Sequence, residues 1–149
     1  MQLERHALIA EHAELGAMLG DLLRHAAQRP PPIADIAQVR WRMSRLLLAH
    51  LAKEDRLLHP LLQRSGDPAA VRLSQQFEAE MGGLSDAFKA YMQDWDARRI
   101  EADPAAFEAA SRALAAALAD RIRREETQLY RHIPAQPPAR TVDAGRVAP

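Results

Sequence analysis

The chain has 149 residues, the length of one ordinary domain and enough to bury an apolar core. Twenty basic and twenty acidic residues leave no net charge, so the charge signature of a general nucleic-acid or membrane-surface binder is missing. The chain has no cysteine, which excludes disulfides and thiolate metal sites and leaves imidazole and carboxylate as possible ligands for iron, manganese or zinc.

Three breaks divide the chain into four long segments with helical periodicity, expected at about residues 3–28, 33–62, from 68 onward and from 104 onward. The breaks are Arg29–Pro32, Ser65–Pro68 and Glu101–Pro104. Two of them end in Asp-Pro, in which Asp can cap the free N–H groups and Pro is tolerated at the first helical position. Short connections make successive helices antiparallel neighbours, so we predict an all-α, up-down-up-down four-helix bundle.

The bundle is expected to occupy residues 1–133. Residues 134–149 have no apolar periodicity, and we expect them to form a flexible C-terminal tail. A continuous second helix would turn Leu57 and Leu61 toward the core. It would also leave His59, like His132 in the fourth segment, near a solvated helix end.

Polar side chains interrupt the apolar stripes of three of these helices. His12 lies on the inward stripe of the first helix, His50 and Glu54 lie one turn apart on the second, and Arg121 and Glu125 do the same on the fourth. Burying ionisable groups without partners costs several kcal/mol, so such groups are normally paired or bound to a metal. The stripes therefore predict either a metal site or a polar network in the core.

Residues 50–60, HLAKEDRLLHP, align with residues 121–131, RIRREETQLYR, with acidic pairs and leucines in step. This duplicated pattern is similar to that of the hemerythrin-like (HHE cation-binding) family, which the chain resembles over roughly residues 1–133. The resemblance implies a non-haem di-iron centre that binds dioxygen or senses iron, oxygen or nitric oxide. The positions that match family ligands are His12, His50 and Glu54 (followed by Asp55 and Pro60), and Glu125.

Three positions depart from the family pattern. Phe77 and Met81 stand where the third helix would supply histidines, and Arg121 stands where the fourth helix would supply one. Arginine is permanently charged and donates five hydrogen bonds, so Arg121 can neutralise Glu54 and Glu125 itself and would repel a second metal ion. We therefore expect no intact di-iron centre, and a degenerate site in which Arg121, Glu54, Glu125 and the histidines form a core network.

Two alternatives stay open beside this network. In one, a single metal ion, iron or less readily manganese or zinc, is held by His12, His50, Glu54 and Glu125. In the other, a metal-free bundle serves as a module for homodimerisation or for binding a protein partner. We expect a binding or sensing protein with a small diatomic ligand rather than an enzyme; iron-dependent peroxide chemistry is the catalytic alternative. The chain has no signal segment and no apolar run of ~18 residues, so we expect a cytoplasmic protein with neither a nucleic-acid nor a membrane partner.

Overall fold

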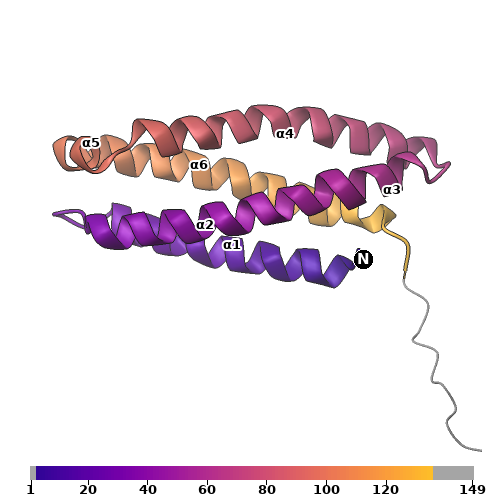
Figure 1. Cartoon of the computed structure of the whole chain (residues 1–149), viewed down its shortest axis with the longest axis horizontal. Coiled ribbons are helices and arrows are strands. Elements are labelled where there is room, and N and C mark those ends of the chain that lie inside the picture. Colours follow the sequence, from indigo (N-terminus) through magenta and orange to yellow (C-terminus); the bar gives the residue numbers. More distant parts are fainter. Residues whose placement is uncertain (1–2, 136–149) are drawn as a thin grey trace, which may run out of the picture.

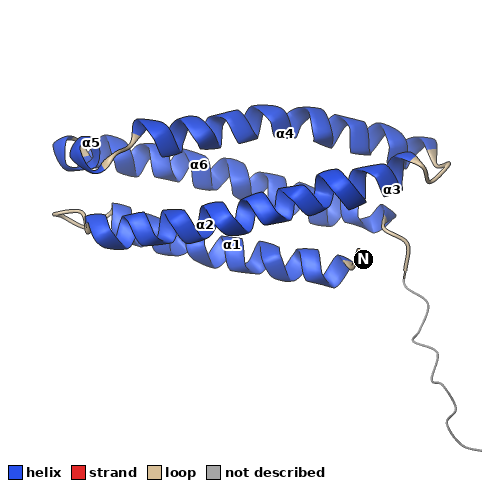
Figure 2. Ribbon diagram, viewed as in Figure 1, coloured by secondary structure: helices blue, strands red, loops and turns tan. Residues whose placement is uncertain are grey.

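The computed structural model describes residues 3–135, and these residues form an all-α bundle (Figures 1 and 2). The four long helices are α1 (Arg5–Ala26), α2 (Ile33–Lys53), α4 (Pro68–Asp94) and α6 (Pro104–Arg124). They run alternately in opposite directions, which confirms the predicted four-helix architecture (Figure 1). From residue 136 onward, the predicted tail lies outside the described residues.

The two Asp-Pro pairs begin α4 and α6 as predicted. The Asp67 and Asp103 carboxylates accept hydrogen bonds of 3.0 Å and 3.1 Å from backbone N–H groups in the first turn of their helices. A short helix, α5 (Ala97–Ala102), was not predicted; it lies between α4 and α6 and is capped by Asp96. Among residues 3–135, none of the helices has the length and apolar character needed to cross a bilayer.

The second and fourth segments each contain one turn of π-helix. The first, η1 (Glu54–Leu58), joins α2 to α3 (His59–Gln63), and the second, η2 (Glu125–Leu129), joins α6 to the short 3₁₀ turn η3 (Tyr130–His132). At the end of each, a backbone N–H donates to the carbonyl five residues earlier, from His59 to Glu54 and from Tyr130 to Glu125. A π-turn holds an extra residue, so the inward face moves by one position along the chain.

The first π-turn makes the predicted inward register wrong beyond residue 54. Leu57 and Leu61 were expected to face the core, but Leu58 and Leu62 are fully buried and Leu61 is 39% exposed. His59, expected at a solvated helix end, is buried for the same reason. The extra residue in η1 accounts for all these differences because it rotates every later side chain relative to an uninterrupted α-helix.

A layer of buried polar side chains divides the apolar core into two clusters. The larger cluster lies toward the α5 end of the bundle. The smaller one lies at the other end, where both ends of the described chain are found, and consists of Leu8, Leu58, Leu62, Phe77, Leu129, Tyr130 and Ile133. Along α1, α2 and α6, the polar residues of this layer fall between positions that belong to the two clusters; they are His12, His50, Glu54, Arg121 and Glu125.

Candidate metal centre

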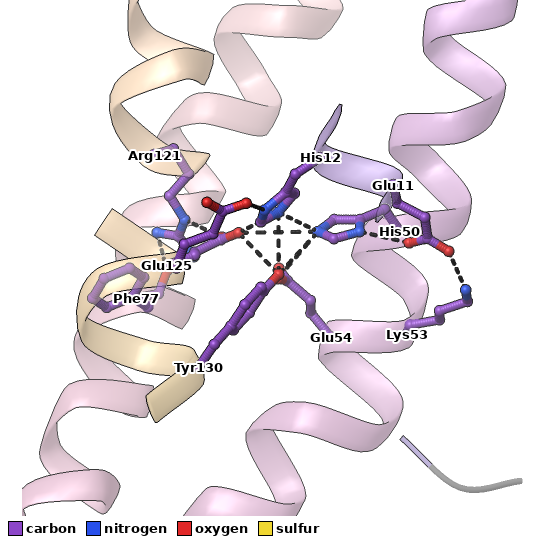
Figure 3. A network of polar contacts seen from close by, with 10 residues as sticks. Glu11, His12, His50, Lys53, Glu54, Phe77, Arg121, Glu125 and Tyr130 are labelled. Carbon is purple, nitrogen blue, oxygen red and sulfur yellow. Dashed lines mark hydrogen bonds and ion pairs between the residues drawn. The ribbon is translucent and has the colours of Figure 1, made fainter. Parts of the chain in front are cut away.

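Four buried side chains from three parts of the chain converge in the polar layer (Figure 3). His12 lies on α1, His50 lies in the last turn of α2, and Glu54 and Glu125 are the first residues of η1 and η2. Each side chain belongs to a residue at most 3% exposed. One possible ligand atom from each residue lies within 4.8 Å of all the others. The structure thus brings together the four residues that the sequence singled out as metal ligands.

The four donor atoms form an open quadrilateral. His12 Nε2 lies 3.0 Å from Glu125 Oε2 and 3.1 Å from His50 Nε2, and His50 Nε2 lies 3.2 Å from Glu54 Oε1. Along one diagonal of this quadrilateral, His50 Nε2 and Glu125 Oε2 are 3.9 Å apart. Two imidazoles and two carboxylates are a donor set suited to one iron, manganese or zinc ion, so the residues present fit a single metal.

A further carboxylate holds each imidazole from outside the cluster. His12 donates Nδ1–H to Glu126 over 3.0 Å, and His50 donates Nδ1–H to Glu11 over 2.7 Å. Glu11 is itself paired with Lys53. A proton fixed on Nδ1 leaves the Nε2 lone pair free to accept, and this second contact is the usual way in which metal-ligating histidines are oriented. Both Nε2 atoms consequently face the same space.

Without a cation, a proton can occupy this space. Burial alone would lower the pKa of His50, but its hydrogen bonds with Glu125 and Glu54 outweigh burial and raise the pKa to about 10. Burial acts to raise the pKa of Glu125, but His12, His50 and Arg121 hold it well below the usual range. The metal-free centre therefore carries a proton on His50 beside ionised Glu125, and a metal ion would have to displace that proton.

Arg121 stands at the edge of the cluster, where the family pattern has a histidine. Its Nε donates to Glu125 Oε1 over 2.5 Å, its Nη1 donates to the Phe77 carbonyl over 2.9 Å, and its guanidinium lies 4.4 Å from the centre of the Phe77 ring. The expected pair with Glu125 is therefore present. Among the described residues, however, Arg121 forms no ion pair with Glu54, which instead accepts a hydrogen bond from Tyr130 over 2.7 Å.

Tyr130 is the member of the cluster that sequence reasoning missed. Its hydroxyl oxygen lies 2.7 Å from Glu54 Oε1, 3.1 Å from His12 Nε2, 3.3 Å from Glu125 Oε2 and 3.4 Å from His50 Nε2 (Figure 3). Burial and the two carboxylates raise the pKa of Tyr130 far above its usual range, so the metal-free phenol is protonated. The alignment of residues 50–60 with 121–131 pairs Tyr130 with His59, but only the π-turn shows that this position faces the ligands.

An apolar cavity of about 20 Å³ adjoins the cluster. Its lining includes His12, His50, Arg121 and Glu125 together with Leu15, Leu19, Leu47, Leu51, Met81, Leu118 and Ile122. This volume is enough for one water-sized molecule. A larger apolar groove of about 250 Å³, lined by residues of α2, α4 and α6, shares Leu47, Leu51, Met81 and Leu118 with the cavity. The cavity and the groove therefore adjoin each other.

Comparison with protein families matches residues 4–133 to the hemerythrin HHE cation binding domain. The chain belongs to the hemerythrin HHE family. Comparison with curated proteins and with solved structures gives no match. Membership of this family confirms the resemblance seen in the sequence, and the buried histidines and carboxylates of this hemerythrin-like bundle fit a metal ion.

Proposed function

We propose that this hemerythrin-like chain binds one non-haem iron ion through His12, His50, Glu54 and Glu125. The observation that carries the proposal is the orientation of the imidazoles: the outer carboxylates accept hydrogen bonds from both Nδ1–H groups, and both Nε2 atoms face the two inner carboxylate oxygens. Once the proton on His50 is displaced, the two Nε2 lone pairs, 3.1 Å apart, would both be free to bind one ion. Manganese and zinc also bind to donor sets of this kind, and we propose iron among the three metals.

We propose further that the guanidinium of Arg121 supplies the positive charge that a second metal ion would otherwise provide. The other half of a di-iron centre would need imidazoles where this chain has Phe77, Met81 and Arg121. A divalent ion 4 Å from a guanidinium would meet a repulsion of roughly 8 kcal/mol at an effective dielectric constant of about 20. The short contact between Arg121 and Glu125 supports this replacement because it satisfies a carboxylate oxygen that a second ion would otherwise bind.

The role that this arrangement supports is binding or sensing of a small molecule rather than enzymatic turnover. When bound, iron would supply a coordination position for a diatomic ligand such as nitric oxide, which binds both divalent and trivalent iron. The adjoining cavity of about 20 Å³ supports a ligand of this size. Its leucines exclude water from one side of the cluster, while Arg121 holds Glu125 in place.

Metal analysis by mass spectrometry tests the proposal on protein expressed with iron and purified without chelators. We expect one iron per chain, lost in His50→Ala. The matched control is His59→Ala, because His59 is equally buried but bonds to Ser74 outside the cluster and should leave the iron in place. Circular dichroism checks that both variants fold. Two irons per chain would contradict the role of Arg121, and no metal would leave the metal-free interaction module as the better hypothesis.

A further inference from the structure

We propose that the phenolic oxygen of Tyr130 is a fifth ligand to the ion, and that it makes the centre selective for trivalent iron. This inference rests on the proposed function, because it concerns the same ion. The hydroxyl oxygen of Tyr130 lies within 3.4 Å of a donor atom of each of the four other residues.

Three sides and one diagonal of the four-donor set can be compared with the base of a square pyramid. An ion about 2.1 Å from its ligands holds adjacent donors about 3.0 Å apart and opposite donors about 4.2 Å apart. Taken in the order Glu125, His12, His50, Glu54, adjacent donors are 3.0, 3.1 and 3.2 Å apart. The measured diagonal, from His50 to Glu125, is 3.9 Å, longer than each of these three sides.

The Tyr130 oxygen has the separations expected at the apex. An apical donor is adjacent to all four basal donors, and the distances from the hydroxyl to them run from 2.7 to 3.4 Å. A tyrosine that only oriented Glu54 through a hydrogen bond would need one of these contacts. A protonated His50 would account for one more, whereas contacts with donor atoms of all four residues follow directly if all five atoms surround one ion.

The position of the hydroxyl is fixed by packing. Tyr130 is fully buried, and its ring stacks on the His12 ring with centroids 5.3 Å apart and an angle of 12° between the planes. The π-turn η2 begins at Glu125 and places Tyr130 on the same side of the helix five residues later. Its oxygen is therefore presented to the centre by the fold, without a change of backbone.

The charges around the centre account for the preference for a trivalent ion. Four carboxylates (Glu11, Glu54, Glu125 and Glu126) face two cations (Lys53 and Arg121), which leaves two negative charges. Coordination by Tyr130 breaks its O–H bond, forms an oxygen–metal bond and releases the proton to solvent, which adds a third negative charge without oxidation or reduction. The three positive charges of iron(III) balance these three negative charges. Phenolate oxygen is an established protein ligand of iron.

The experiment is visible absorption and resonance Raman spectroscopy of protein loaded with iron(III), with iron content measured on the same sample. We expect a visible phenolate-to-iron charge-transfer band in the natural protein and none in Tyr130→Phe, which keeps the stacked ring. The chain has only one other tyrosine, Tyr91, which is buried and bonded to Ser111. Tyr91→Phe is therefore the matched control and should keep the band. Tyr130→Phe should also lower iron(III) affinity roughly tenfold or more and zinc affinity by less.

The outcomes separate this inference from the proposed function. One iron per chain without the band would overturn ligation by Tyr130 and leave the proposed function standing, as would a band that survives Tyr130→Phe. Absence of bound iron would overturn both. If Tyr130→Phe does not fold, resonance Raman spectra of the natural protein made with ring-deuterated tyrosine decide the matter. Shifted ring modes in the enhanced bands would support Tyr130 as the ligand, and unshifted spectra would overturn it.

Discussion

Replacing Arg121 with methionine removes a buried cation while keeping a side chain of similar reach, so it measures how far the guanidinium stabilises Glu125. The variant loses the 2.5 Å contact with Glu125 and the 2.9 Å hydrogen bond to the Phe77 carbonyl. Removing one partner of a buried ion pair costs about 3–5 kcal/mol. His12 also contacts Glu125 at 3.0 Å and retains part of the stabilisation, so we expect a loss of about 3 kcal/mol in the free energy of unfolding.

The assay is urea and thermal unfolding of metal-free protein, followed by circular dichroism. For a chain of this length, a loss of about 3 kcal/mol should lower the melting temperature by roughly 10 °C. Bound metal should reduce the difference between Arg121→Met and the natural protein, because the ion supplies positive charge to the stranded carboxylate. The metal should therefore raise the melting temperature of the variant by more than that of the natural protein.

A double variant, Arg121→Met with Glu125→Gln, provides the control for this prediction. It removes the stranded charge together with its partner, so we expect it to recover at least about half of the stability lost in Arg121→Met. If the double variant is as unstable as the single one, the cost arises from lost packing against Phe77. The assignment of Arg121 as a substitute cation would then be refuted.

Three further predictions concern the outer carboxylate, the bound proton and the π-turn. Glu11→Gln should weaken metal binding by roughly tenfold to a hundredfold in competition titrations, because it removes the charge that orients His50. Zinc affinity measured calorimetrically should rise with pH by about tenfold per unit below about pH 10, because binding displaces the proton from His50, whose pKa is raised to about 10 in the metal-free protein. Leu58→Ala should cost about 2–5 kcal/mol of unfolding free energy in urea titrations, and Leu57→Ala distinctly less, because only Leu58 is fully buried.

Each of these has a clear contrary result. Unchanged metal affinity in Glu11→Gln would mean that packing alone holds the His50 ring in place. A zinc affinity that does not change with pH would show that His50 carries no proton when metal is absent. Equal losses for Leu57→Ala and Leu58→Ala would contradict the π-turn, since an uninterrupted helix would place Leu57 toward the core.

The helices and the inward direction of His12, His50 and Glu54 could be predicted because they depend on local signals. Apolar periodicity gives the inward face of a helix, and Asp-Pro pairs mark where helices begin. Arg121 and Glu125 were predicted as partners because residues one turn apart lie side by side on a helix. These signals act within a few residues, so one sequence is enough to read them.

The two π-turns could not be predicted, and the wrong inward register in the second segment and the missed Tyr130 in the fourth follow from them. A π-turn adds one residue to a helical turn, and no characteristic residue type marks it in a sequence. A prediction that uses a period of 3.6 therefore continues the apolar stripe through the π-turn without the shift. His59 and Tyr130 were both missed as buried residues for this reason. Both lie five residues after an inward-facing carboxylate, a spacing that faces the core only in a π-helical turn.

The polar layer makes the two ends of this bundle unequal. The smaller apolar cluster joins the start of α1, the segment from η1 to α3, the first half of α4 and the segment from η2 onward, and it is separated from the main core by the charged groups. Elements with few apolar contacts open at lower free energy than the rest of a structure, so we expect this end to open while the α5 end stays folded. An ion that enters during such an opening would join η1, η2 and α1 as the helices close. Loading with metal would then complete the folding of one end of the molecule, and amide exchange there would slow when the ion binds.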